Sequence, residues 1–340
     1  MSGIPSFARI DYQIRSNKNI ERKIVFDVLS HVQAVVDFSH HKYLGLGSMW
    51  FTDFRLAHKL LGLDRMISIE RTDSARAEFN KPYRNIEVKD GDCLNVLRGL
   101  DDAEWQDPFI TWFDFDGNLD EEICETMNLY LNKCAPNSVL LITVNATASH
   151  YQRGRKRVQD ERSGTSVGVI EEFLGKGCVD IRFEPKITGG QKYEDISQSD
   201  FCDFLADALL NHMEHKITST GRESGMTPVQ FVPVFSFFHK DGADMVTVGG
   251  IIASKGCLEE WRKGLGEYFP SSDGKKPDLQ CIDLVPMTLK EKLELDACLP
   301  YSEEEFLGKA ESRGLKIDSE NMKKYRHFYR HFPVFGETQI

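Results

Sequence analysis

The sequence predicts an α/β protein whose central sheet is mostly parallel and ends in an antiparallel hairpin. Three observations support this prediction. Short apolar runs alternate with helical patterns five times in the first 150 residues, as expected for parallel strands joined by crossover helices. Two apolar, β-branched runs then flank Asp241-Gly242, which is a strong hairpin signal. Beyond residue 255 the pattern becomes mostly helical and polar.

The length and the change of pattern suggest two parts. A chain of 340 residues exceeds the usual size of one hydrophobic core. We therefore predict a main α/β domain over residues 1–255, with an N-terminal helix and an insertion around residues 147–200. Residues 256–340 are predicted to form a helical C-terminal appendage.

Composition excludes several classes of protein. Hydrophobic residues make up 41% and charged residues 28%, as in ordinary soluble proteins. No apolar run is long enough to cross a membrane, and the polar start does not resemble a secretory signal, so we expect a cytoplasmic protein. A net charge of -11 disfavours non-specific binding of nucleic acid. The eight cysteines include no C-x-x-C pair and are predicted to be free thiols.

The first half of the sheet follows from alternating apolar runs. A helical stripe of apolar residues from Ile20 to Val32 predicts the first helix. The run "HKYLGLGS" predicts a strand, and the helix after it is closed by Gly62. The run "RMISIE" predicts a second strand that ends on Glu70, followed by a helix that Pro82 interrupts.

Three further runs complete the parallel part. "NIEVKDGDCLNVL" predicts a strand, a turn at Asp92 and a helix. "PFITWFDFDG" predicts a fourth strand that ends in Asp114 and Asp116, and "SVLLITVNA" predicts the fifth. Ligands bind at the carboxyl ends of the strands in open α/β sheets. The glycines and acids at these ends are therefore candidate site residues.

The glycine pair leaves open which nucleotide binds. In the dinucleotide pattern G-x-G-x-x-G the third glycine allows close packing, but here that position is Trp50. Glu70 follows Gly47 by 23 positions, a spacing that suits a ribose contact in NAD and in S-adenosylmethionine alike. Asp92 lies where an adenine ring would bind, and the terminal hairpin favours S-adenosylmethionine.

With these features the chain resembles the class I S-adenosylmethionine-dependent methyltransferases over roughly residues 20–255. The resemblance implies a Rossmann-like methyltransferase fold. It also implies that Glu70 holds the ribose and Asp92 the adenine amine. The stretches "RSNKNIERK" and "GLGSMWFTDF" are similar to prokaryotic proteins described as O-methyltransferases. The cofactor-binding residues that the resemblance implies are Gly45, Gly47, Ser48, Glu70, Asp92 and Asp114.

The chain departs from the family pattern in its first motif. Tyr43 stands where the family has an acid, and Met49 replaces the third glycine. Asp53 is the nearest carboxylate that can replace the missing acid, although a helical position leaves its direction open. The degenerate motif leaves a second class of function, a methyltransferase fold that binds or scaffolds without turnover. An NAD-dependent oxidoreductase is a third, disfavoured by Trp50 and the hairpin.

The acids after the fourth strand are candidates for catalysis. Asp114 and Asp116 can each act as a general base, with His150 and His239 as alternatives. The N-methylating pattern [DNS]-P-P-[YFW] is absent, which favours an oxygen acceptor. "WFDFDG" is similar to a metal-binding stretch of cation-dependent O-methyltransferases. The later Asp-Asn pair of that family is Val144-Asn145 here, so a divalent metal is not favoured.

Several of these residues also have a purely structural interpretation. The two glycines can form a tight turn, and Asp92 can cap the helix that follows it. Glu70 can cap the helix after it, although Thr72 is better placed to do so. A basic cluster in the insertion is most often a solvated loop, but it also fits a nucleotide or nucleic-acid acceptor. It consists of Arg153, Arg155, Lys156 and Arg157.

Overall fold

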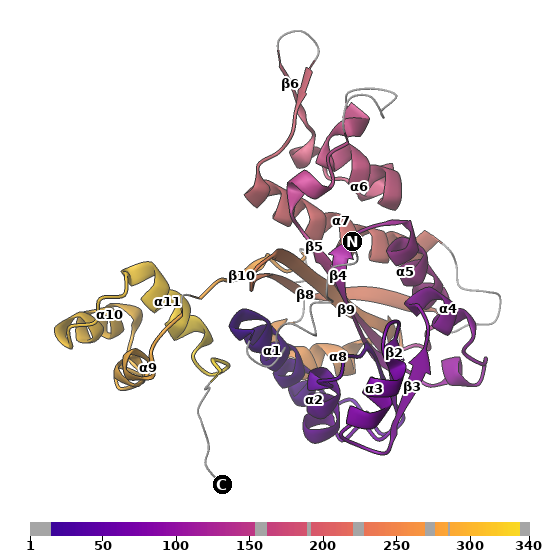
Figure 1. The fold of residues 1–340 in the computed structure, drawn as a ribbon, viewed down its shortest axis with the longest axis horizontal. Coiled ribbons are helices and arrows are strands. Elements are labelled where there is room, and N and C mark those ends of the chain that lie inside the picture. The colour runs from indigo at the N-terminus through magenta and orange to yellow at the C-terminus, as the bar shows by residue number, and fades with distance from the viewer. Residues whose placement is uncertain are drawn as a thin grey trace.

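The computed structural model describes residues 15–153, 162–188, 192–219, 228–268, 276–284 and 286–333. Its centre is an eight-stranded sheet with the order β10-β8-β9-β5-β4-β1-β2-β3 (Figure 1). The five strands from the first half of the chain are all parallel to one another, as predicted. These strands are β1 (Lys42–Leu46), β2 (Met66–Glu70), β3 (Ile86–Asp90), β4 (Phe109–Asn118) and β5 (Ser138–Asn145).

The predicted hairpin forms the other half of the sheet. Strands β8 (Val229–Lys240) and β9 (Asp244–Ser254) are antiparallel, and β9 pairs with β5 in the same sense. The turn between them contains Gly242 at φ +118°, a conformation that glycine adopts without strain. A third strand, β10 (Gln280–Ile282), adds to β8 in parallel. The expectation of a mostly helical tail missed β10, because three residues are too few to show a strand period.

Helices cover both faces of the sheet (Figure 1), so the sheet separates the hydrophobic core into two clusters. One face packs against α4 (Cys93–Arg98), α5 (Glu121–Lys133), α6 (Ser166–Leu174) and α7 (Gln198–Ser219). The other packs against α1 (Ser16–Gln33), α2 (Thr52–Leu61), α3 (Ser74–Asn80) and α8 (Leu258–Leu265). This arrangement is the predicted Rossmann-like fold, in which buried strands meet helices on both faces.

The last helices form a group beyond the β10 edge of the sheet (Figure 1). They are α9 (Leu289–Asp296), α10 (Glu303–Ser312) and α11 (Ser319–Phe328). Before them, α8 packs Trp261 against Phe38 at a ring distance of 6.0 Å. Both α8 and β10 therefore belong physically to the main sheet and its helices, although they follow the predicted boundary at residue 255.

The insertion forms a projecting unit above the sheet (Figure 1). It contains α6 and a two-stranded ribbon of β6 (Lys186–Thr188) and β7 (Lys192–Glu194). All eight cysteines are free, as predicted. Among the described helices, none is both long and apolar enough to cross a membrane.

Candidate active site

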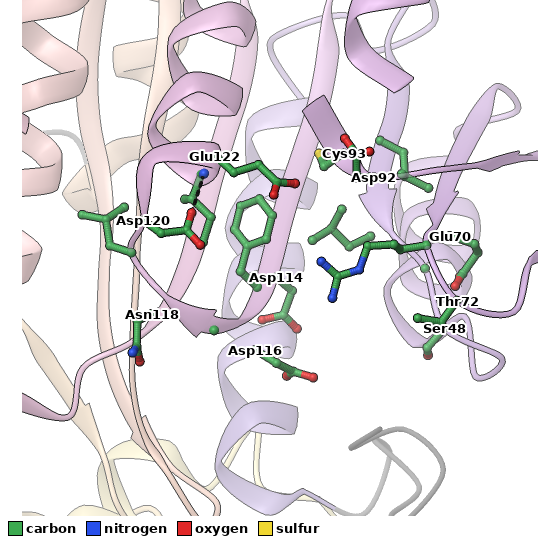
Figure 2. Close-up of a pocket in the computed structure, with 18 of the residues that line it drawn as sticks. Ser48, Glu70, Thr72, Asp92, Cys93, Asp114, Asp116, Asn118, Asp120 and Glu122 are labelled. Atoms are coloured by element: carbon green, nitrogen blue, oxygen red, sulfur yellow. Dashed lines mark hydrogen bonds between the residues drawn. The ribbon is translucent and has the colours of Figure 1, made fainter. Parts of the chain in front are cut away.

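A cavity of about 980 Å³ opens at the carboxyl ends of the parallel strands (Figure 2). Its walls come from the ends of β1, β2, β3 and β4 and from the start of the insertion. The structure thus brings most of the candidate residues from the sequence to one place. These are Gly47, Ser48, Glu70, Asp92, Asp114, Asp116 and His150.

Glu70 is the most distinctive group at the cofactor end of this cavity. It is 7% exposed, and its Oε1 atom and the Ser68 hydroxyl are buried without a hydrogen bond of normal geometry among the described residues. Burial raises the pKa of Glu70 to about 7, and the neighbouring Ser68 hydroxyl opposes only part of that rise. Glu70 nevertheless lines the cavity, so a ligand hydroxyl that donates to this carboxylate would offset part of the cost of its burial.

Gly47 leaves the space that this carboxylate occupies. A Cβ atom at Gly47 would lie 1.9 Å from Ser68 Oγ and 2.3 Å from Glu70 Oε1. Only glycine therefore allows the loop after β1 to approach the end of β2 this closely. The Glu70 carboxylate and the Gly47 loop lie side by side on the cavity wall, and their chemistry is compatible with the ribose of S-adenosylmethionine.

The substitution Gly47→Ala is expected to weaken binding of S-adenosylmethionine at least about tenfold. The new methyl group must displace Ser68 and Glu70, and such overpacking also costs about 1–3 kcal/mol of stability. Isothermal titration and thermal unfolding measure the two effects. Gly117→Ala is a matched control, because Gly117 lines the same cavity and its Cβ would meet nothing within 4 Å. Unchanged binding in Gly47→Ala would contradict a cofactor loop at this position.

Gly45 and Tyr43 lie behind the cavity wall. A Cβ atom at Gly45 would lie 3.1 Å from Tyr43 and 3.4 Å from Phe54, so this glycine allows α2 to pack on β1. Tyr43 is buried and does not line the cavity. Asp53, in the first turn of α2, does line it. Burial raises the pKa of Asp53, and the charge of Arg22 opposes the rise.

Asp92 and Asp73 follow strands and cap the helices that come after them. The Asp92 carboxylate accepts a hydrogen bond from Asn95 N at 2.9 Å and caps α4. This bond lowers the pKa of Asp92. Asp92 therefore caps the helix, as the structural interpretation proposed, and it also lines the cavity. Asp73, rather than Thr72, caps α3, so Glu70 is left to face the cavity.

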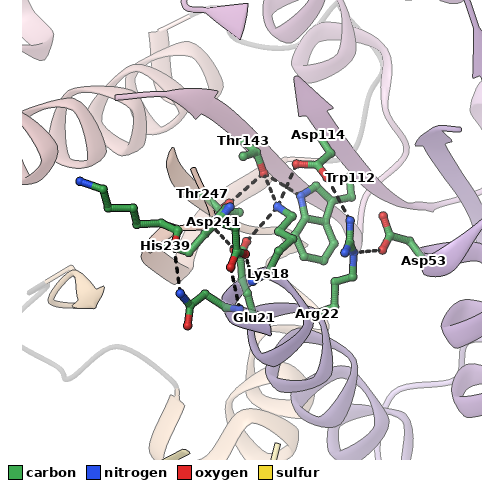
Figure 3. A network of polar contacts seen from close by, with 12 residues as sticks. Lys18, Glu21, Arg22, Asp53, Trp112, Asp114, Thr143, His239, Asp241 and Thr247 are labelled. Atoms are coloured by element: carbon green, nitrogen blue, oxygen red, sulfur yellow. Dashed lines mark hydrogen bonds and ion pairs between the residues drawn. The ribbon is translucent and has the colours of Figure 1, made fainter. Parts of the chain in front are cut away.

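Asp114 is held by two cations from helix α1 (Figure 3). Lys18 Nζ lies 2.8 Å from Asp114 Oδ1, and Arg22 Nη2 lies 3.4 Å from Oδ2. Burial alone would raise the pKa of Asp114, but the charges of Lys18 and Arg22 outweigh it and lower the pKa to about 2. Arg22 Nε also contacts Asp53 Oδ1 at 2.5 Å. Asp114 thus anchors α1 to the end of β4.

His239 belongs to the same network and not to the cavity. Its Nδ1 atom lies 2.6 Å from Glu21 Oε2, and its side chain is only 5% exposed. Burial would raise the pKa of Glu21, but Lys18 and His239 lower it overall. A position beside a hairpin turn does not leave His239 exposed, because α1 packs across the hairpin and covers it. His239 is consequently placed as an ion-pair partner and not as a base at the site.

The remaining candidate bases are Asp116 and His150. A carboxylate with a pKa of about 2 is a poor proton acceptor near neutral pH, which disfavours Asp114 in that role. Asp116 projects from the end of β4 beside Asp114 (Figure 2). His150 ends the short helix Ala148–His150 after β5 and lines the cavity. Its Nδ1 atom lies 3.3 Å from Asn118 Oδ1, which leaves Nε2 as the nitrogen that can accept a proton.

Several cavity residues escaped the sequence analysis. Arg22 lies in a helix that showed only its apolar stripe. Phe115 lies inside the predicted fourth strand, and Asn118 directly follows it. Val169 and Phe173 are one helical turn apart on α6, a spacing that also fits ordinary core packing. Of the basic cluster, Arg153 lines the cavity and pairs with Glu172 at 2.5 Å. Arg155, Lys156 and Arg157 lie outside the described residues.

The residues compatible with a metal are dispersed. Asn145, part of the Val144-Asn145 pair, accepts a hydrogen bond from Thr147 N at 2.9 Å. Within the described ranges no group of three or more His, Cys, Asp or Glu side chains is arranged to hold a metal ion.

The sheet order, the glycine cradle and the strand-end acids together define a class I S-adenosylmethionine-dependent methyltransferase. The family described as "Putative O-methyltransferase" matches residues 10–340, and the chain belongs to that family. This membership confirms the predicted resemblance to the methyltransferases. A comparison with curated proteins gives no match.

Similar solved structures are distant. The mitomycin 7-O-methyltransferase MmcR is 15% identical, with a TM-score of 0.31, 68% of this chain covered and 54% of the other. Human N-acetylserotonin methyltransferase in complex with SAM is 13% identical, with a TM-score of 0.29 and coverages of 74% and 61%. An S-adenosylmethionine-dependent methyltransferase structure from Listeria monocytogenes is 8% identical, with a TM-score of 0.32 and coverages of 67% and 98%. The chain spans little more than half the length of the first two.

Proposed function

We propose that the protein transfers the methyl group of S-adenosylmethionine to an oxygen atom of a small acceptor molecule bound in the cavity. The observation that carries this proposal is the placement of Glu70 and His150 on the walls of one cavity. Glu70 lines the cavity with a carboxylate that would accept hydrogen bonds from a ribose, and His150 would offer a nitrogen to a hydroxyl proton. Oxygen as the acceptor also agrees with the description of the family.

Different residues of the chain would bind the parts of the cofactor and accept the proton. Glu70 would accept hydrogen bonds from the ribose hydroxyls, and Asp92, with the neighbouring backbone, would bind the adenine edge. Gly47 and Ser48 would pass under the amino-acid end of the cofactor, with Asp53 as the nearest carboxylate in place of the acid missing at Tyr43. S-adenosylmethionine, when bound, supplies an electrophilic methyl group on a sulfonium. His150 Nε2 would take the proton that the acceptor hydroxyl loses.

Turnover is favoured over the scaffold alternative by the cavity itself. Acids lie at the ends of three strands around it, and His150, the proposed proton acceptor, lies on the wall that the insertion forms. A pure scaffold has no need of a base beside a cofactor pocket. A nucleotide or nucleic-acid acceptor, suggested by the basic cluster, stays a prediction. The single described member, Arg153, already pairs with Glu172.

The first test is the pH dependence of S-adenosylmethionine binding. Because burial raises the pKa of Glu70 to about 7, the free carboxyl is largely protonated at pH 6 and ionised at pH 8. The ionised form is the better acceptor for ribose hydroxyls. We expect the affinity to rise about tenfold between pH 6 and pH 8, measured by isothermal titration.

The variant Glu70→Gln separates this effect from titration of the cofactor itself. It should bind more weakly than the wild-type protein at pH 8, and its affinity should vary less across the same range. Circular dichroism of both proteins checks that the fold is kept. A well-folded wild-type protein that does not bind S-adenosylmethionine at any pH would refute the proposed function.

A further inference from the structure

The cavity has a second half that the cofactor residues leave unused. Its volume of about 980 Å³ lies at the upper end of the range for ligand sites, roughly 300–1,000 Å³. The residues that would bind the cofactor lie at the ends of β1, β2 and β3. The remaining wall comes from the end of β4, from the start of α5 and from the insertion, so a second ligand can bind there.

The wall of this second half contains a group of apolar and aromatic side chains beside its acids. Phe115 lies at the end of β4, and Val169 and Phe173 face the cavity from α6. Leu119 and Ile123 add to it from the start of α5. Such side chains favour a flat apolar or aromatic body, which packs against them without leaving polar groups unpaired. Polar and charged side chains share this wall, and among them His150 and Asn118 can hydrogen-bond an acceptor hydroxyl.

The charge around the cavity sets a second condition on the acceptor. Three arginines face seven carboxylates. Arg22 pairs with Asp53 and Asp114, and Arg153 pairs with Glu172. An anionic ligand would therefore meet a net negative wall inside a partly desolvated space, where like charges repel strongly. The carboxylates are Asp53, Glu70, Asp92, Asp114, Asp116, Asp120 and Glu122, and the arginines are Arg22, Arg71 and Arg153.

We infer that this half of the cavity is the acceptor subsite and that it takes small hydroxyl-bearing aromatic molecules without an anionic group. The inference rests on the proposed function and makes it specific. Phe115 and Phe173 hold the ring, the strand-end acids reject anions, and His150 faces the reacting hydroxyl. In the transfer, the acceptor oxygen forms a bond to the methyl carbon as the sulfur–methyl bond breaks. The electron pair of the broken sulfur–methyl bond stays on the sulfur, and the hydroxyl proton passes to His150.

The test uses three para-substituted phenols that share a two-carbon chain and differ in the charged group at its end. Tyramine is cationic, 4-ethylphenol is neutral and 3-(4-hydroxyphenyl)propionate is anionic. Each is titrated into the full-length protein saturated with S-adenosylhomocysteine, which cannot donate a methyl group. We expect the first two to bind and the anionic phenol to bind at least about tenfold more weakly. Adenosine monophosphate, a probe for a nucleotide acceptor, should not bind beside S-adenosylhomocysteine.

Two variants link the preference to the proposed wall. Phe173→Ala should weaken tyramine and 4-ethylphenol at least about fivefold. The control Phe183→Ala changes a partly buried ring of the same insertion that does not line the cavity, and it should leave both affinities unchanged. In Asp116→Asn the difference in affinity between tyramine and the anionic phenol should become smaller.

The outcomes separate this inference from the proposed function. Failure to bind S-adenosylhomocysteine in the first step refutes the proposed function. Normal cofactor binding with equal or preferred binding of the anionic phenol, or of adenosine monophosphate, overturns the acceptor class. Normal cofactor binding with no phenol bound overturns it as well.

Discussion

Replacing Lys18 by methionine is expected to destabilise the protein by about 3–5 kcal/mol, because it leaves a buried charge without its partner. Lys18 is 3% exposed and lies between Asp114 and Glu21, at 2.8 and 3.3 Å. Its ammonium group also donates to Thr143 Oγ1 at 3.1 Å and lies 4.6 Å from the centre of the Trp112 ring. Denaturant unfolding of the variant and the wild-type protein measures the difference.

The same variant should change how stability depends on pH. In the wild-type protein the pKa of Asp114 is about 2, below the value of about 3.9 for an unfolded aspartate. A lowered pKa in the folded state contributes stability above pH 4, which is lost as the pH falls from about 4 to 2. Without Lys18 the pKa of Asp114 rises. The stability difference between variant and wild type should therefore shrink over that acid range.

Two further variants make this expectation specific. Lys23→Met alters a partly exposed lysine on the same helix and should cost less than about 1 kcal/mol. Adding Asp114→Asn to Lys18→Met removes a buried carboxylate that Arg22 alone would then compensate, and it should restore part of the lost stability. A loss of the same size for Lys23→Met, or a double variant no more stable than the single one, would contradict a specific buried ion pair.

The fold was largely predictable because its signals are local. Alternating apolar runs mark each parallel strand, and Asp241-Gly242 alone marks the hairpin that distinguishes this sheet from other doubly wound sheets. β10 was missed for the opposite reason. Its three residues form a strand only because β8 offers an open edge, and no pattern within so short a segment encodes that pairing.

The site was predictable where a residue acts at its own strand end, as Gly47 and Glu70 do. It was not predictable where the partners are far apart in sequence. Lys18 and Asp114 are 96 positions apart in the numbering, and their pairing depends on how α1 packs across the sheet. The apolar stripe of α1 predicted the helix correctly, but it gave no indication that Lys18 and Arg22 would also be buried. The roles of Asp114 and His239 changed for this reason.

The second large effect is expected at His150. Replacing it by alanine should lower the rate of methyl transfer to an accepted phenol by about 10²-fold or more, the usual contribution of a general base. Binding of S-adenosylmethionine should be unchanged, since the cofactor residues lie on the other side of β4. Single-turnover kinetics with labelled S-adenosylmethionine separates the transfer step from binding.

Chemical rescue with imidazole and a control variant at another histidine distinguish a catalytic role of His150 from a structural one. Added imidazole should restore part of the rate in His150→Ala, because a free base can enter the space left by the ring. His40→Gln changes an exposed histidine that does not line the cavity and should transfer the methyl group at the wild-type rate. An undiminished rate in His150→Ala would assign the proton to another group, with Asp116 the next candidate on the cavity wall.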